Sequence, residues 1–133
     1  MEKTKTNTIR IKTTKKEELI DITDDLKKFA ERVENGSVLF VYTPHTTAGI
    51  TINESAGIEQ DVIEALSKIV PEQNEYKHNK IDNNAAAHIK SSLIGCSKII
   101  PIKNRKLELG TWQRVFFCEF DGPREREIIL MLL

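Results

Sequence analysis

The chain has 133 residues, and its 20 basic and 20 acidic side chains leave no formal net charge. This length predicts one domain, residues 1–133, while 39% apolar and 30% charged residues argue against disorder. Neutrality disfavours nucleic acid as a partner, and the absence of an apolar run of ~18 residues disfavours a membrane. The start of the chain lacks a signal-peptide core, and the two widely spaced cysteines predict reduced, buried thiols in a cytoplasmic protein.

The first half of the chain predicts three strands and one helix. Residues 6–13 alternate between apolar and polar, as a half-exposed strand does. Apolar residues recur at helical spacing from Ile22, and Gly36 ends that helix. Residues 37–43 are apolar on both faces and predict a central strand, followed by a short strand at 49–53.

The second half predicts two helices and then four strands. Apolar spacing marks a helix over 58–70, closed by Pro71, and Asn84 and Gly95 bound a helix over 85–94. The predicted strands are 98–102, 107–109, 112–120 and 126–133, with a hairpin turn at 103–106. The expected fold is α+β: a mixed, mostly antiparallel β-sandwich or barrel-like sheet with about three covering helices.

A turn after the central strand presents His45, Thr46 and Thr47 together, and Asn53 and Glu54 follow at the end of the next strand. Imidazole titrates near neutral pH and binds metals, so His45 is a candidate functional group. The alternative for the threonines is ordinary turn chemistry, in which their hydroxyls bond loop amides.

His78 and His88 are the remaining histidines of the chain. Three imidazoles match the ligand count of a catalytic zinc site with one open position. Their spacings of 33 and 10 residues match no compact zinc signature, and a lone helical histidine is more often simply hydrogen-bonded. Asp61 could join Glu54 in holding a cation or orienting a histidine.

The last group of candidates surrounds the strand predicted over 112–120. Trp112 offers a flat face for stacking, with a role in the core as the alternative. Glu119 lies in an apolar strand, where an ionised carboxylate needs a partner. Arg124 and Arg126 alternate and could form a fork for phosphate or carboxylate, the alternative being a salt bridge from Arg124 to Asp121 or Glu119.

From about residue 9 to the C-terminus, the sequence resembles the YjbQ family, also called secondary thiamine-phosphate synthase enzymes. The motifs that carry the resemblance are His45-Thr46-Thr47-Ala48, Asn53-Glu54, Asp61, Tyr76 with His78, Ala87-His88-Ile89-Lys90, Ile100-Pro101, Leu109-Gly110-Thr111-Trp112-Gln113 and Glu119-Phe120-Asp121-Gly122-Pro123-Arg124. One departure is Ala86, where many relatives carry a second helical histidine.

The resemblance implies a compact α+β homotrimer that weakly joins the pyrimidine and thiazole halves of thiamine, with release of pyrophosphate, as its main activity or as one secondary to another role. Under this hypothesis His45, Glu54, His78, His88 and Glu119 are catalytic, and His45, His78 and His88 hold a divalent metal, Mg²⁺ or Zn²⁺. The expected substrate-binding residues are Thr46, Thr47, Asn53, Trp112, Gln113, Arg124 and Arg126.

Two alternatives to this small-molecule transferase remain open. One is a zinc-dependent hydrolase of unknown substrate, in which Glu54 or Glu119 acts as the base. The other is a non-catalytic protein that binds a small molecule.

Overall fold

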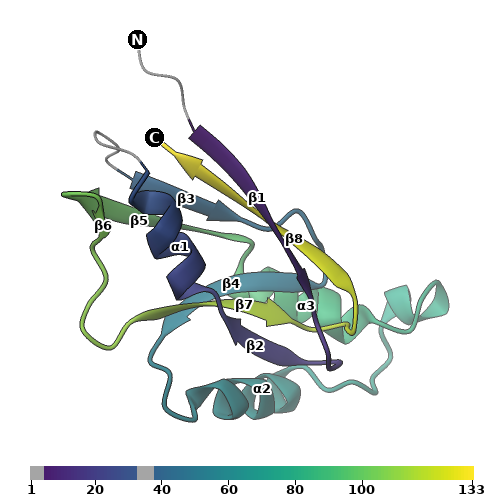
Figure 1. Ribbon diagram of the computed structural model, residues 1–133. Helices are drawn as coiled ribbons and strands as arrows, with labels where there is room; N and C mark the ends of the chain where they lie inside the picture. Colours follow the sequence, from purple (N-terminus) through teal and green to yellow (C-terminus); the bar gives the residue numbers. More distant parts are fainter. Residues whose placement is uncertain (1–4, 33–37) are drawn as a thin grey trace.

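A computed structural model describes residues 5–32 and 38–133, which form two antiparallel sheets and three α-helices (Figure 1). The five-stranded sheet has the order β1 (Lys5–Lys12), β8 (Glu125–Leu132), β3 (Val38–Tyr42), β5 (Ser97–Lys103) and β6 (Lys106–Leu107). The three-stranded sheet has the order β2 (Glu18–Asp21), β7 (Arg114–Glu119) and β4 (Ala48–Asn53). The helices are α1 (Thr23–Ala30), α2 (Ile58–Ile69) and α3 (Ala85–Ile94), with a 3-10 turn, η1, at Lys77–Lys80.

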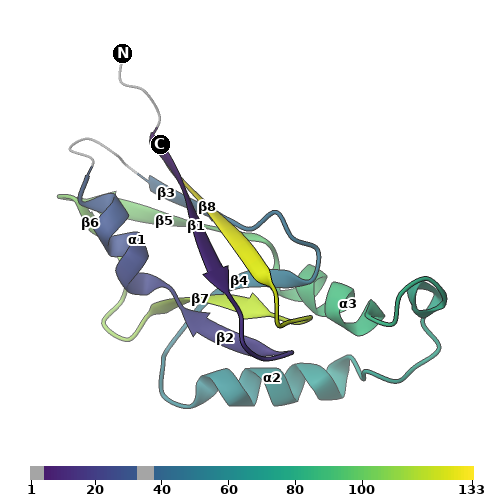
Figure 2. The same ribbon diagram turned by 45° about the vertical axis from the view of Figure 1, so that its right-hand side comes forward.

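The alternation of side chains along β7 explains how the layers pack. Val115 and Phe117 point into the main core, which lies between the two sheets and also holds Leu26 of α1. Cys118 and Phe120 pack on the opposite side, with Leu66 of α2 and further residues of α3. Figure 2 shows α2 running beside β2, while α3 lies at the N-terminal end of β4, where the Ser91 hydroxyl donates to the Ala48 carbonyl oxygen. The small sheet is therefore covered on both faces.

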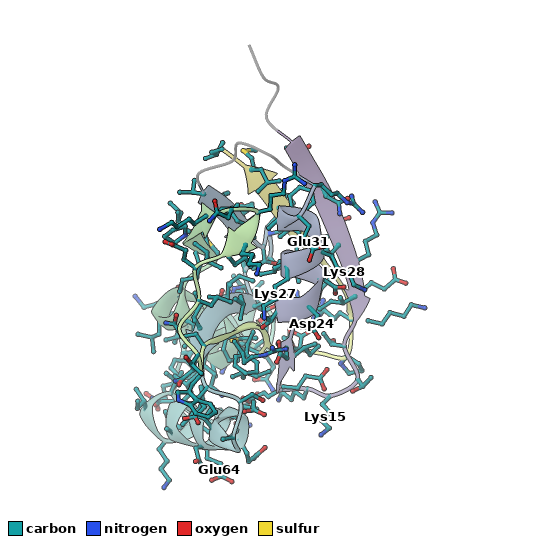
Figure 3. The ribbon with its side chains drawn as sticks, turned by 60° about the vertical axis from the view of Figure 1, so that its left-hand side comes forward. Lys15, Asp24, Lys27, Lys28, Glu31 and Glu64 are labelled. Carbon is teal, nitrogen blue, oxygen red and sulfur yellow. The ribbon has the colours of Figure 1, made fainter. Side chains whose placement is uncertain are left out.

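The outward face of α1 is charged, as expected for a helix with one apolar stripe. Figure 3 shows Asp24, Lys27, Lys28 and Glu31 projecting away from the sheets. The opposite face buries Leu26, Phe29 and Ala30 in the core.

A buried ion pair ties α3 to its surroundings. The Lys90 side chain is 1% exposed, and its Nζ lies 2.9 Å from Oε1 of Glu17, just before β2, and 3.3 Å from Oγ of Ser67 in α2. Because a buried ammonium group needs such partners, Lys90 fixes α3 relative to α2 and β2.

The fold confirms the expected α+β class: three helices accompany a curled antiparallel sheet and a second sheet. The predicted helices over 58–70 and 85–94 match α2 and α3 closely. The predicted hairpin turn is also present, with Asn104 and Arg105 at positive φ. The predicted first helix ends at Gly36, whereas α1 already ends at Ala30 and is followed by a turn. Gly36 itself and the start of the central strand at 37 lie outside the described residues.

Three further local predictions were wrong. The strand β2 was missed because its four residues are too few to alternate visibly before the helical pattern of α1. Trp112 precedes β7 instead of lying within it. Cys96 is exposed, whereas Cys118 is buried as predicted, and burial raises the pKa of the Cys118 thiol to about 12.

Among residues 5–32 and 38–133, no helix has the length and apolar character needed to cross a membrane.

We expect Phe117→Ala to lower the free energy of unfolding by about 3–5 kcal/mol, since Phe117 is fully buried and its loss leaves a cavity between the sheets. Urea denaturation measures the change. The matched control is Lys28→Ala on the exposed face of α1, expected to change stability by no more than about 0.5 kcal/mol. Similar effects of the two substitutions would contradict this description of the core.

Candidate functional site

Several predicted site residues meet around the turn that joins β7 to β8. Glu119 ends β7, and Arg126 lies near the start of β8, with side chains 0% and 4% exposed. Arg126 Nε donates to Glu119 Oε1 at 2.8 Å, and its Nη2 donates to Glu119 Oε2. The two residues thus form a bidentate ion pair that joins the two sheets at one end of the core.

Neighbouring groups satisfy the rest of this ion pair. The Thr13 hydroxyl donates to Glu119 Oε1 at 2.7 Å, and the Asp121 amide donates to Oε2 at 3.0 Å. Arg126 Nη2 also donates to Thr47 Oγ1 at 2.9 Å. Gly122 closes the turn where a Cβ would overlap the Lys15 carbonyl oxygen.

These contacts explain why an acidic residue lies in an apolar strand. Both oxygens of Glu119 are occupied, so the carboxylate is a structural partner of Arg126 and does not have the open position that a general base needs. The predicted fork of two arginines does not form. Arg126 is buried, whereas Arg124 is exposed and bonds Asp121 at 2.8 Å, the alternative weighed for it.

His45 completes the hydrogen bonding of β8 at a point where strand pairing has stopped. The pairing of β3 with β8 ends at Tyr42 and Ile129. Beyond it, the Thr43 hydroxyl donates to the Glu127 carbonyl oxygen at 3.0 Å, and the Glu127 amide donates to Nε2 of His45 at 2.9 Å. Two side chains therefore substitute for the missing backbone partners.

This hydrogen bond fixes the tautomer of His45. Because Nε2 accepts a hydrogen bond, the neutral ring carries its proton on Nδ1. Burial lowers the pKa of His45 below its usual 6.5, and the positive charge of Arg126 adds to the effect. The imidazole is therefore neutral at pH 7, and its Nε2 lone pair is already used.

The other two histidines lie together, joined to the same turn by a polar chain. The rings of His78 and His88 are 4.5 Å apart between centroids, edge to face. His78 Nε2 lies 2.9 Å from Asn84 Oδ1, and Asn84 Nδ2 donates to Asp121 Oδ2 at 2.9 Å. Since Asp121 also accepts from Arg124, the chain runs from the histidine pair to the β7–β8 turn.

The three imidazoles do not form one metal centre. Across residues 5–32 and 38–133, no group of three or more His, Cys, Asp or Glu side chains is placed to hold a metal ion. His78 and His88 form a pair, but the Nε2 of His45 is engaged with β8. The residues of a single chain therefore do not fit the predicted three-histidine site.

Most of the remaining predicted residues lie at the opposite end of the small sheet. Ala48 pairs with Glu119 at one end and Asn53 with Arg114 at the other, about 17 Å away at 3.4 Å per residue. Glu54, Trp112 and Gln113 are exposed near this second end, and Asp61 is exposed on α2. Thr46 is exposed in the turn beside His45.

Trp112 is 71% exposed, so it is not a core residue. The loop beneath it is nonetheless ordered by hydrogen bonds: the Gly110 amide donates to Gln113 Oε1 at 2.8 Å, and the Gln113 amide donates to the Gly110 carbonyl oxygen at 3.0 Å. The Gln113 side-chain oxygen is thereby used within the loop.

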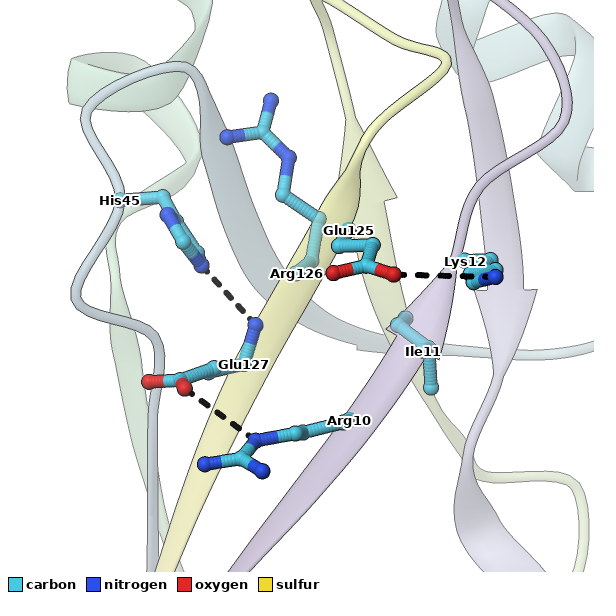
Figure 4. A pocket seen from close by; sticks show the side chains of 7 residues that line it. All are labelled: Arg10, Ile11, Lys12, His45, Glu125, Arg126 and Glu127. Carbon is cyan, nitrogen blue, oxygen red and sulfur yellow. Dashed lines mark hydrogen bonds and ion pairs between the residues drawn. The ribbon is translucent and has the colours of Figure 1, made fainter.

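A cavity of about 460 Å³ lies beside β8 (Figure 4). Its lining residues are Arg10, Ile11, Lys12, His45, Glu125, Arg126 and Glu127. Charges of opposite sign alternate across it: Arg10 Nε is 3.4 Å from Glu127 Oε1, and Lys12 Nζ is 3.6 Å from Glu125 Oε1. Both pairs are largely exposed and contribute little to stability.

Sequence reasoning missed Arg10, Lys12, Glu125 and Glu127 as lining residues. The alternation over 6–13 placed Arg10 and Lys12 on the polar face of a strand, but nothing local showed that β8 would lie beside it. Asn84 was predicted as a helix cap, and its side chain instead connects His78 to Asp121.

We expect Glu119→Gln and Arg126→Met each to lower the free energy of unfolding by about 3–5 kcal/mol, because each leaves a buried charge without its partner. The double variant should lose clearly less than the sum of the two single changes. Urea denaturation of all four proteins gives the coupling. Strict additivity would show that the two side chains do not stabilise each other.

The lowered pKa of His45 predicts a loss of stability in mild acid. Below its ordinary pKa of 6.5 the unfolded chain takes up a proton that the folded protein binds less readily, so the free energy of unfolding falls as pH drops from 6.5 through the lower folded pKa. His45→Gln, which keeps an acceptor for the Glu127 amide, should lose less stability than the wild type between about pH 7 and pH 5.5. Equal losses in urea denaturation would contradict the assignment.

Comparisons with known proteins agree with this fold. Residues 7–133 match the family model described as UPF0047 protein YjbQ-like. A UPF0047 protein of Archaeoglobus fulgidus is 48% identical over 126 residues, covering 94% of this chain and 98% of that protein. The UPF0047 protein YugU of Bacillus subtilis is 42% identical over 130 residues, covering 95% and 97%.

Solved structures show the same arrangement. The crystal structure of a YbjQ-like protein of unknown function from Sulfolobus solfataricus has a TM-score of 0.94 at 33% identity, covering 98% of this chain and 96% of that one. An uncharacterised YjbQ/UPF0047 family protein of Clostridium acetobutylicum has a TM-score of 0.90 at 43% identity, covering 96% and 99%. This chain belongs to the YjbQ-like UPF0047 family.

Proposed function

We propose that this protein binds a phosphorylated small molecule in the cavity beside β8 and catalyses the reaction of thiamine-phosphate synthase there, as a main or a secondary activity. The observation that carries the proposal is the alternation of cations and carboxylates around the cavity. Thiamine phosphate has a positively charged thiazolium ring and a negatively charged phosphate, so a lining with charges of both signs suits it.

The reaction requires electrostatic stabilisation more than proton transfer. The thiazole nitrogen donates its lone pair to the methylene carbon of the activated pyrimidine, and the carbon–oxygen bond to pyrophosphate breaks with its electrons on oxygen. The nitrogen becomes positive without losing a proton. Glu127 and Glu125 would stabilise the new cation, while Arg10 and Lys12 would stabilise the pyrophosphate.

A divalent cation, Mg²⁺ or Zn²⁺, would neutralise charge on the pyrophosphate in this scheme. Among the residues described, no group of acidic, histidine and cysteine side chains is placed to hold it, so we assign it no protein ligands. The scheme also needs no imidazole base, consistent with the engaged Nε2 of His45.

We propose further that a second copy completes the site, within a homotrimer. Asn53, Glu54, Trp112 and Gln113 lie about 17 Å from the β7–β8 turn, too far to touch the same ligand within one chain. In a closed ring of copies, unlike surfaces meet at each contact. Trp112 of one copy would then stack on the heterocycle bound by the next.

The two free cysteines favour a cytoplasmic location.

Purified protein incubated with the pyrimidine pyrophosphate, the thiazole phosphate and Mg²⁺ should form thiamine phosphate, measured by chromatography. We expect His45→Ala to reduce the rate at least tenfold, because it removes one polar side chain from the cavity wall, and the loss of one charge-stabilising group has an effect of about that size. Trp112→Ala should reduce it about two- to tenfold through lost stacking. The matched control is Glu64→Ala on the exposed side of α2, which should retain the full rate.

Other outcomes would identify the alternatives. Release of phosphate from a phosphate ester without coupling of the two halves, lost on removal of zinc, would favour the hydrolase. A ligand-dependent rise in melting temperature without turnover would favour a binding protein. Full activity of Trp112→Ala would contradict a site completed by a second copy.

A further inference from the structure

His45 has an unused hydrogen-bond donor in the wall of the cavity. Its Nε2 accepts the Glu127 amide, so the proton of the neutral ring lies on Nδ1. Nδ1 has no hydrogen-bond acceptor among the described residues, although the side chain is half buried. Nδ1 is also not one of the fully buried polar atoms without a partner, so it is open to a hydrogen-bond acceptor that enters the cavity.

Arg126 has a second unused donor in the same cavity. Its Nε and Nη2 bond Glu119 and Thr47, whereas Nη1 has no partner in the described part of the chain. Nη1 is also not one of the fully buried polar atoms without a partner, so solvent reaches it, and Arg126 is one of the residues that line the cavity. The ion pair with Glu119 holds the guanidinium in place, and the donor is preorganised.

The two donors come from different elements and neither can accept a hydrogen bond. His45 lies in the loop after β3, and Arg126 lies in β8 (Figure 4). Arg10 and Lys12 add positive charges at the rim, on exposed side chains of β1 that pair with Glu127 and Glu125. Water can satisfy both donors in the free protein, and a negatively charged ligand oxygen that replaces the water accepts stronger hydrogen bonds from them.

We propose that Nδ1–H of His45 and Nη1 of Arg126 form an oxyanion subsite that holds a phosphoryl oxygen of the ligand. His45 acts there as an uncharged donor whose tautomer is set by the backbone of β8, and not as a metal ligand or a base. This inference rests on the proposed function for the identity of the whole ligand, but the subsite binds pyrophosphate by itself.

Two substitutions separate the two nitrogens of His45. In His45→Asn, the amide NH₂ lies near the position of Nδ1, but the shorter side chain does not reach the Glu127 amide. In His45→Gln, the amide oxygen reaches the position of Nε2 and accepts that amide, but the side chain has no donor at the Nδ1 position. The probe is inorganic pyrophosphate, titrated by calorimetry at about pH 7.5 with EDTA present, and acetate is the comparison anion.

We expect the wild type to bind pyrophosphate more tightly than acetate, and His45→Asn to bind it within about threefold of the wild type. His45→Gln should bind about ten- to a hundredfold more weakly, the effect of one lost hydrogen bond to a charged acceptor. In ¹⁵N-histidine spectra of the wild type, the Nδ1–H resonance of His45 should shift on titration while the ring stays neutral.

Four results would overturn the subsite. The first three are the absence of pyrophosphate binding by the wild type, weaker binding in His45→Asn than in His45→Gln, and a positively charged His45 in the complex. Acetate binding as tight as pyrophosphate would show a general anion site and also overturn it. The proposed reaction is tested separately. If no thiamine phosphate were formed, but the wild type and His45→Asn bound pyrophosphate more tightly than His45→Gln, the subsite would still be supported.

Discussion

The arrangement of the candidate site depends on one buried ion pair, between Glu119 of β7 and Arg126 of β8. The two strands belong to different sheets, and the pair lies where those sheets come together at the end of the core. Two buried charges are tolerated only with complete hydrogen bonding. Thr13, Thr47 and the Asp121 amide therefore take fixed positions around it, and they bring the ends of β1, β4 and β7 to the same turn.

The same pair explains the position of the cavity. Arg126 is held by Glu119 on one side and lines the cavity on the other. His45 is held by the Glu127 amide, which lies beyond the last paired residues of β3 and β8. Both cavity-lining groups are thus positioned by bonds that have nothing to do with a ligand, so the site is formed before anything binds.

Local patterns predicted the parts of the fold that depend on local sequence. The apolar spacing of α2 predicted that helix correctly, and Asn84 and Gly95 marked the two ends of α3. The alternation of apolar and polar residues in β1 predicted which face of the strand is exposed. The four residues of β2 gave no visible alternation, and this strand exists because it pairs with β7. Its formation is a tertiary effect that no window of sequence contains.

The candidate site was predictable as residue types but not as contacts. The need of Glu119 for a partner followed from its apolar surroundings, but the choice of Arg126 over Arg124 depends on where the turn ends and β8 begins. The role of His45 depends on an unpaired amide 82 residues away. The separation of Trp112 from the histidines follows from the register of β4 and β7, which sequence spacing does not reveal.

The unequal surroundings of the two cysteines give the molecule a practical property. Cys118 is packed beneath α2 and α3 with its sulfur protonated, whereas Cys96 lies exposed between α3 and β5. Alkylating reagents react with accessible thiolates. A maleimide fluorophore or spin label should consequently attach at Cys96 alone, so the unmodified chain already behaves as a single-cysteine protein for site-specific labelling.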